Sequence, residues 1–210
     1  MAELNIKNLV KSYGSYTVLA FDKWELKDGL YWIKGGNGTG KTTLFKVIAG
    51  QTPFDGEVSI NGISLRKRPS LYRSLLSFAE AEPQYPSFIT GTELLDFYCK
   101  VRKTTRKSTD ELIEQFKMGD SMNNKISSYS SGMLKKLSLI CAFTGNIEFY
   151  LLDEPLITID AASAQVLYEC IKNRRQEGAT FMISTHQEME RTAIEVDGTF
   201  EINQHKLSAC

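Results

Sequence analysis

Hydrophobic and polar residues alternate along the first part of the chain, which predicts antiparallel β-strands there. The alternation runs over residues 4–13 and again over residues 18–26. A third short strand is expected over residues 57–60, because it ends in Asn61-Gly62, a pair that favours a tight hairpin turn. This part of the chain therefore predicts a small antiparallel sheet.

Apolar runs and helical periodicity divide the rest of the chain. Apolar runs predict buried strands over residues 30–33, 149–152 and 180–184, with short strands over 199–202 and 205–207. A 3.6-residue period predicts helices over residues 44–49, 92–101, 109–116, 131–143 and 161–175. We therefore predict one α/β domain over residues 1–210, with a core (1–80 and 147–210) interrupted by a helical segment at 81–146.

The composition is that of an ordinary globular protein and restricts its partners. The 25 Lys and Arg residues balance the 25 Asp and Glu residues, so no overall field favours nucleic acid or an anionic membrane. The four cysteines form no C-x-x-C pair, which is typical of reduced thiols in a cytosolic protein. Neither a signal-peptide core nor an apolar run of about 18 residues is present, so we expect a cytoplasmic protein.

Residues 34–43 carry the clearest chemical signal. They fit the phosphate-loop pattern G-x-x-x-x-G-K-[ST] between a predicted strand and a predicted helix. The glycines let backbone N–H groups surround a phosphate, and the helix begins with its positive dipole end at the same anion. The cation of Lys41 suits the β- and γ-phosphates, and the hydroxyl of Thr42 suits Mg²⁺. The predicted nucleotide-binding residues of this loop are Gly35, Gly36, Asn37, Gly38, Thr39, Gly40, Lys41, Thr42 and Thr43.

Two carboxylates follow the apolar strand predicted over residues 149–152. In a parallel sheet the carboxyl end of a strand is where ligands bind. Asp153 is therefore expected to hold Mg²⁺, and Glu154 to polarise the water that attacks the γ-phosphate. Two acids that merely cap the next helix are the simpler interpretation, but the phosphate loop upstream argues against it.

Two weaker signals complete the candidate site. A single histidine is usually structural, but His186 follows the strand predicted over residues 180–184 and would lie at the same sheet edge as the two carboxylates. Ser130 or Ser131 is expected to cap the helix at 131–143. The free N–H groups of that helix start offer a second anion site, far from the first in sequence.

This set of motifs, in this order, resembles the ATP-binding subunit of an ABC transporter over nearly the full length of the chain. The resemblance implies that Tyr13 stacks on adenine, that the phosphate loop is Walker A, and that Asp153 and Glu154 belong to Walker B. It also implies that Asp160 lies in the D-loop and that His186 is the switch histidine. The fold implied is a P-loop core with a parallel sheet, an antiparallel β-subdomain and a helical insertion.

Residues 129–133 lie where this family carries its Leu-Ser-Gly-Gly-Gln signature. Their form Tyr-Ser-x-Gly-Met is similar to small exporter subunits of the haem-exporter and drug-resistance type. The resemblance gives Ser130, Ser131, Gly132 and Met133 a nucleotide-binding role, although Ser131 replaces a glycine and its Cβ narrows the approach of a phosphate. The Q-loop glutamine has no clear equivalent among residues 80–84. Glu82 is aligned there, with Ala81 as the alternative and Gln84 slightly beyond. The carboxylate of Glu82 would suit Mg²⁺.

The resemblance also implies a mechanism and partners. ATP and Mg²⁺ would join this chain head to tail with a second copy of itself or a related ATPase subunit, and each signature segment would complete the partner's site. Hydrolysis would drive a separate transmembrane permease subunit, reached through the helical insertion. The protein would then lie peripherally on the inner face of the cell membrane, touching the membrane only via the permease and binding no nucleic acid directly.

Two other functions remain open from the sequence. One is a soluble ABC ATPase without a membrane partner, such as an iron–sulfur assembly ATPase. DNA-repair members are disfavoured, because the interval of about 90 residues between Walker A and the signature has no coiled-coil heptads. Translation factors carry two motif sets, and this chain has one. The other function is an ATP-binding switch with little turnover, which Glu154 argues against.

Overall fold

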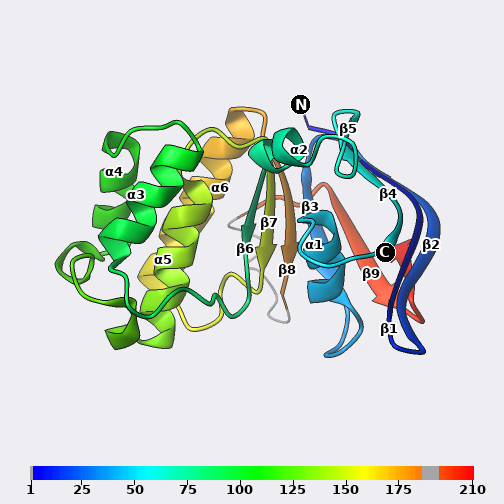
Figure 1. Cartoon of the computed structure of the whole chain (residues 1–210), viewed down its shortest axis with the longest axis horizontal. Coiled ribbons are helices and arrows are strands. Elements are labelled where there is room, and N and C mark those ends of the chain that lie inside the picture. The colour runs from blue at the N-terminus through cyan, green and yellow to red at the C-terminus, as the bar shows by residue number, and fades with distance from the viewer. Residues whose placement is uncertain (1, 186–193) are drawn as a thin grey trace.

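The computed structural model of the chain describes residues 2–185 and 194–210. Within these residues the strands form two sheets (Figure 1). The smaller sheet is antiparallel, with the order β2-β1-β4-β5. Its strands are β1 (Leu4–Tyr13), β2 (Tyr16–Leu26), β4 (Asp55–Ile60) and β5 (Ile63–Ser64). The β4–β5 hairpin turns at Asn61 and Gly62, whose φ angles of 51° and 72° are those such a pair favours.

The larger sheet has the order β10-β9-β3-β8-β7-β6 and is parallel from β9 to β6. The last strand, β10, pairs antiparallel with β9. The strands are β3 (Leu30–Lys34), β6 (Leu76–Ala79), β7 (Phe149–Asp153), β8 (Thr180–Ser184), β9 (Gly198–Asn203) and β10 (Lys206–Ala209). Because β8 lies between β3 and β7, the carboxyl ends of these three strands meet at one edge, where the candidate site is built.

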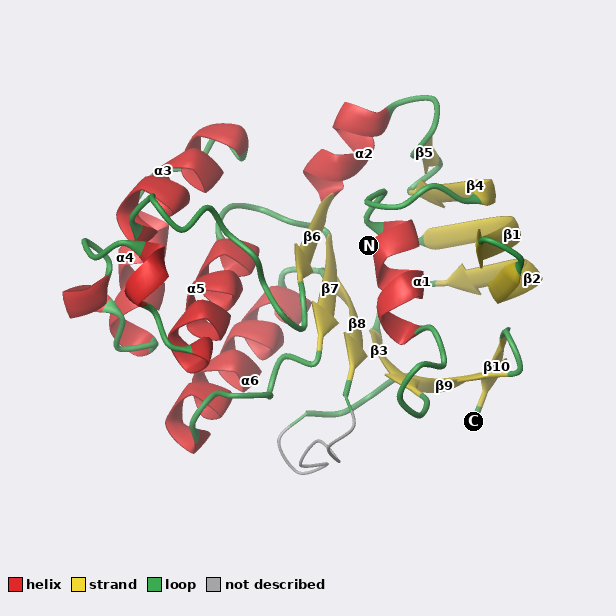
Figure 2. Cartoon of the chain, turned by 60° about the horizontal axis from the view of Figure 1, so that its bottom comes forward, coloured by secondary structure: helices red, strands yellow, loops and turns green. Residues whose placement is uncertain are grey.

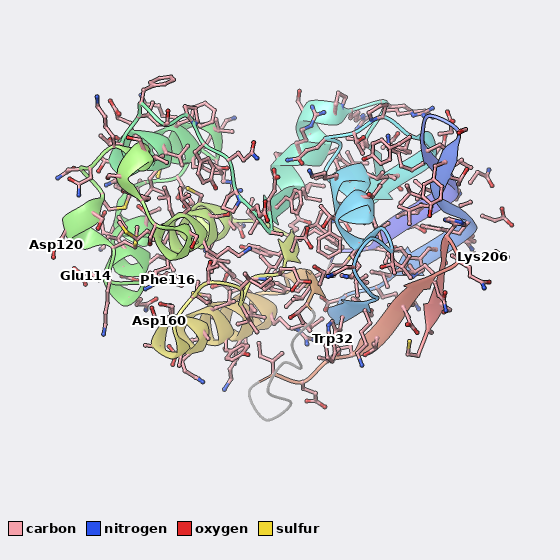
Figure 3. The ribbon with its side chains drawn as sticks, turned by 90° about the horizontal axis from the view of Figure 1, so that it is seen from below. Trp32, Glu114, Phe116, Asp120, Asp160 and Lys206 are labelled. Atoms are coloured by element: carbon pink, nitrogen blue, oxygen red, sulfur yellow. The ribbon has the colours of Figure 1, made fainter. Side chains whose placement is uncertain are left out.

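Helices lie on both faces of the larger sheet (Figures 1 and 2). One helix, α1, lies between the two sheets, whereas α5 and α6 pack on the opposite face with α3 and α4 beyond them. The helices are α1 (Lys41–Ile48), α2 (Pro69–Leu75), α3 (Gly91–Val101), α4 (Lys107–Gln115), α5 (Ser131–Phe143) and α6 (Ala161–Gln176). Asp120 and Lys206 mark opposite ends of the molecule (Figure 3). Among the described helices, none combines the length and apolar character needed to cross a membrane.

Each face of the larger sheet has its own hydrophobic core. Along β7, Phe149 and Leu151 join the core that contains α1 and the smaller sheet, while Tyr150 and Leu152 join the core under α5 and α6. Successive side chains of a strand point to opposite faces, so a strand covered on both sides is apolar at every position. This is why the run at 149–152 is continuous rather than alternating.

The cysteines are free, as the sequence predicts. Cys99, Cys141 and Cys170 are buried, and Cys210 is exposed. Burial raises the pKa of the Cys141 thiol to about 12 and that of Cys170 to about 11. The buried thiols are therefore packing residues with little thiolate at neutral pH.

The predicted α/β architecture, with an antiparallel sheet and added helices, agrees with the structure, and the predicted strands and helices are found within a few residues of their expected ends. The sequence patterns did not predict α2 and β6, because each is too short to show a period. The expected strand at 205–207 begins one residue later. His205 instead lies in the β9–β10 turn with a φ of 68°.

Candidate nucleotide-binding site

The phosphate loop connects β3 to α1. Gly40 precedes α1 with a φ of 109°, a conformation that favours glycine, and a Cβ there would lie 2.9 Å from the Val18 side chain. At Gly35 a Cβ would lie 2.5 Å from the hydroxyl of Thr39. The loop thus depends on glycine both for its backbone angles and for its close packing against β2.

Lys41 is the first residue of α1, and its side chain folds back over the loop. Its ammonium group donates hydrogen bonds to the carbonyl oxygens of Gly35 (2.7 Å) and Gly36 (3.0 Å). Burial lowers the pKa of Lys41, an effect partly opposed by the nearby carboxylates of Glu154 and Asp153. These contacts hold a cation at the mouth of the loop, where a bound phosphate would take the place of the carbonyl oxygens as its partner.

Asp153 joins the phosphate loop to the neighbouring strand. The Thr42 hydroxyl donates to Asp153 Oδ2 at 2.7 Å, and the Ser184 hydroxyl donates to Asp153 Oδ1. Asp153 and Ser184 lie directly opposite each other in the β7–β8 ladder, and both are fully buried. Two hydroxyl groups therefore hold the carboxylate, and one of them, that of Thr42, lies 111 residues away in the sequence.

The residues present fit a Mg²⁺ ion. The adjacent hydroxyl and carboxylate of Thr42 and Asp153 are hard oxygen ligands, the kind that Mg²⁺ prefers. Across the described ranges no group of three or more His, Cys, Asp or Glu side chains is placed to hold a metal. Mg²⁺ usually takes one or two protein ligands and completes its shell with water and phosphate oxygens.

Glu154 follows Asp153 in a left-handed backbone conformation, with a φ of 47°. Its N–H group donates to the Ser184 carbonyl oxygen at 3.0 Å, and Ser184 Oγ lies 3.2 Å from the same nitrogen. Only 6% of the residue is exposed, and it lines a cavity of about 490 Å³ together with the phosphate loop. The lining residues are Val18, Asn37, Gly38, Thr39, Gly40, Lys41, Thr42, Thr43, Ala81, Glu154 and Ile157.

A second cavity of about 620 Å³ shares Thr42 and Ala81 with the first. Glu82 lines this second cavity and not the first. Glu80, in the same loop, accepts a hydrogen bond from Gln51 Nε2 at 3.1 Å. The loop at 80–84 thus borders the phosphate site along its edge.

The residues of the predicted signature lie at the start of α5 and outside the first cavity. Ser130 is the N-cap, and its hydroxyl accepts a hydrogen bond from the N–H of Met133 at 3.3 Å. Ser131 is the first helical residue, so its backbone needs no glycine there. Gly132 packs against the loop between β7 and α6. The packing is so close that a Cβ on Gly132 would lie 2.7 Å from the carbonyl oxygen of Thr158.

Asp160 caps α6, as Figure 3 shows at the start of that helix. It accepts hydrogen bonds from the N–H of Ser163 (2.8 Å) and from Lys136 Nζ (2.6 Å). These hydrogen bonds, the one from Lys136 first, lower the pKa of the Asp160 carboxyl well below its usual range. The residue thus links α6 to α5 and does not line either cavity.

Tyr13 lies at the end of β1, and 53% of it is exposed. It pairs with Tyr16 across the β1–β2 hairpin, and the ammonium of Lys11 lies 4.2 Å from the centre of its ring. Val18, two residues beyond Tyr16 on β2, reaches the first cavity. The β1–β2 hairpin therefore contributes Val18 to the cavity and carries the exposed ring of Tyr13 near its turn. His186, the remaining predicted site residue, lies outside the described residues.

Sequence patterns did not identify three residues that shape the site: Val18, Ser184 and Lys135. Lys135 is buried at the start of α5, and its ammonium donates to the carbonyl oxygen of Asp153 at 2.9 Å. Ser184 could have been found from the predicted strand at 180–184, whose last residue must lie at the same edge as Asp153. Lys135 had no such signal, because a lysine in a helix is usually exposed.

Comparisons with known proteins agree with this geometry. The model of the ABC transporter family matches residues 24–157, more than half of the chain. The chain is 28% identical over 192 residues to the ABC-type transporter ATP-binding protein EcsA of Bacillus subtilis (strain 168), covering 89% of this chain and 78% of EcsA. It is 26% identical over 212 residues to the linearmycin resistance ATP-binding protein LnrL of the same strain, covering 98% and 68%.

A solved structure of the ATP binding subunit of an ABC transporter has the same fold. Its TM-score is 0.89 at 23% identity, over 99% of this chain and 89% of that chain. The family match spans both the phosphate loop and the carboxylates of Asp153 and Glu154 at the end of β7. The chain therefore belongs to the ABC transporter family, as an ATP-binding and ATP-hydrolysing subunit of a transporter.

Proposed function

We propose that this subunit is a Mg²⁺-dependent ATPase that pairs head to tail with a second copy of itself or a related subunit, and so drives a separate permease. The observation that carries the proposal is the hydrogen bond between Thr42 and Asp153, with Glu154 lining the same cavity. Phosphoryl transfer depends on positioning and charge stabilisation, and a hydroxyl hydrogen-bonded to a buried carboxylate beside a phosphate loop provides both.

In this proposal each residue has a defined task. Backbone N–H groups of residues 35–43 and the Lys41 ammonium bind the phosphates. Thr42 and Asp153 would hold Mg²⁺, with Glu82 from the second cavity as a further ligand. The ion supplies charge neutralisation at the β- and γ-phosphates. Glu154 accepts a proton from the attacking water, because Glu154 lines the same cavity as Lys41. Tyr13 stacks on the base, and His186 contacts the γ-phosphate.

The second half of the site would come from the partner. Ser130, Ser131, Gly132 and Met133 do not line the cavity of their own subunit, and in this proposal they serve a nucleotide bound to another copy. Asp160, on the adjoining helix cap, would belong to the same interface. Residues 1–80 and 147–210 would form the nucleotide-binding core, and residues 81–146 would carry the movement to the permease. The subunit would lie at the membrane only through that permease.

We further propose export as the direction of transport. Residues 129–133 have the form found in exporter-type subunits, and one relative is named for linearmycin resistance. The alternatives of an iron–sulfur assembly ATPase and a switch with little turnover have no specific observation in their favour.

The proposal is tested with the Glu154→Gln variant. Removing the proton acceptor is expected to lower turnover by about 10²- to 10⁴-fold while ATP still binds. Light scattering should then find a dimer with Mg-ATP and a monomer with ADP. Glu169→Gln, the same change at an exposed position on α6, is the matched control and should turn over like the wild type.

Two further variants test the role of Lys41 in ATP binding and the role of Ser130 in the dimer interface. Lys41→Ala removes a cation from a polyanion site and should abolish ATP binding. Ser130→Arg places a long cation at the N-terminus of α5, and in the Glu154→Gln background it should prevent the dimer without unfolding the chain. A dimer of equal strength in the absence of nucleotide would place the interface elsewhere and remove the role given to Ser130.

A further inference from the structure

Lys135 makes a set of contacts that a surface lysine does not make. It is 1% exposed, and its ammonium donates to three backbone carbonyl oxygens, those of Glu80 (2.8 Å), Ala81 (3.2 Å) and Asp153 (2.9 Å). An ammonium group has three N–H donors, so all of them are used. Burial lowers the pKa of Lys135 to about 8, although the carboxylates of Asp153, Glu154 and Glu80 oppose the effect.

One of these bonds bears directly on Glu154. The carbonyl of Asp153 and the N–H of Glu154 belong to the same peptide group. Lys135 holds its oxygen, and Ser184 accepts the hydrogen bond from its nitrogen. A planar peptide held at both ends cannot rotate freely. It therefore helps to hold Glu154 in its left-handed conformation, a strained conformation that persists only where the surroundings determine it.

The other two bonds reach the loop that borders the phosphate site. Glu80 and Ala81 follow β6, and Ala81 lines both cavities. One ammonium group thus ties α5 to the carboxyl ends of β6 and β7. These are separate parts of the sequence, 55 and 18 residues from Lys135.

The position of Lys135 on α5 connects these contacts to the helix start. The helix begins at Ser131, capped by Ser130, and Lys135 lies about one turn later. A shift of the helix start would therefore move the ammonium group and the peptide that it holds. We propose that Lys135 is a positioning residue that transmits nucleotide binding at the N-terminus of α5 to the backbone of Glu154. This inference rests on the proposed head-to-tail pairing.

A purely structural role can be separated from this one, because α5 has a comparable cation at its other end. Arg102 donates to the carbonyl oxygens of Cys141 (2.7 Å), Ala142 (3.0 Å) and Thr144 (2.6 Å). It is a partly buried cation held by backbone carbonyls of α5 and its C-cap. Unlike Ala81, an acceptor of Lys135, none of these acceptors of Arg102 lines either cavity. If buried cations only hold α5 in place, removing either one should have similar consequences.

The test compares Lys135→Met with Arg102→Met. We expect Lys135→Met to lower kcat by about 10- to 100-fold, because a displaced Glu154 no longer has the geometry that catalysis needs. The Kd for fluorescent ATP should change less than about threefold. Arg102→Met should lower the unfolding midpoint but leave kcat within about threefold of the wild type. Lys135→Arg keeps the cation and should recover part of the lost kcat without changing KM. Equal kcat in Lys135→Met and Arg102→Met would overturn the inference.

A second measurement separates this inference from the pairing on which it rests. The double variant Lys135→Met/Glu154→Gln should still dimerise with Mg-ATP, because the start of α5 is intact. If the double variant does not dimerise although Glu154→Gln does, Lys135 is an interface or folding residue, and its positioning role is overturned. If Glu154→Gln itself does not dimerise with Mg-ATP, the head-to-tail pairing is contradicted and Lys135 loses its transmitting role. The kcat comparison would still decide whether Lys135 positions Glu154. Should Lys135→Met not fold, a wild-type kcat in Lys135→Gln would overturn the inference.

Discussion

Replacing Ser184 with alanine removes one of the two hydroxyl groups that hold Asp153. Both residues are fully buried, and the remaining hydroxyl, that of Thr42, donates to the other carboxylate oxygen. Hydrogen bonds to charged groups contribute about 1.5–3 kcal/mol, so we expect the free energy of unfolding to fall by about 2 kcal/mol. For a chain of this size that is a loss of roughly 4–8 °C in Tm.

Urea denaturation in EDTA, followed by tryptophan fluorescence, measures this change without bound metal. The matched control is Ser74→Ala, because the exposed Ser74 hydroxyl donates only to the Leu71 carbonyl oxygen within its own turn. That substitution should alter the free energy of unfolding by less than about 0.5 kcal/mol. Ser184→Ala should also require more Mg²⁺ for half-maximal ATPase activity, since Asp153 is less well fixed. Equal urea midpoints for Ser184→Ala and wild type would refute the stabilising role of the hydroxyl.

Three other outcomes follow from the structure. Gly132→Ala should lower stability by about 1–3 kcal/mol in thermal unfolding, because its Cβ would lie 2.7 Å from the Thr158 carbonyl oxygen, whereas Gly119→Ala meets open space and should be neutral. Tyr13→Ala should weaken ATP binding by about 1–3 kcal/mol in calorimetry if the ring stacks on the base; unchanged affinity with lower stability would make it a strand residue only. A thiol reagent at pH 8 should modify Cys210 alone in the native protein and all four cysteines after denaturation, since burial shields the other three and raises their pKa. Rapid modification of more than one native thiol would contradict this.

The local chemistry of the phosphate loop and the carboxylates was predictable because it depends on short segments. A glycine-rich turn followed by Lys41 and Thr42 specifies a backbone shape and a charge within ten residues. The apolar run before Asp153 marks a strand covered on both faces, and the acids after it mark the strand end. Both patterns can be recognised from the sequence alone, because neither requires knowledge of which strands are neighbours.

The relations between distant segments were decided only by the tertiary structure. That Ser184 faces Asp153 depends on β8 lying beside β7 in one register, and a shift of one residue would turn its hydroxyl to the other face. Lys135 carries no sign of burial in the sequence, because its partners are backbone carbonyls that every residue type possesses. The sequence determined which groups could bind a nucleotide. The packing of β6, β7, β8 and α5 decided which groups hold them in place, because non-local hydrogen bonds exist only once the chain has folded.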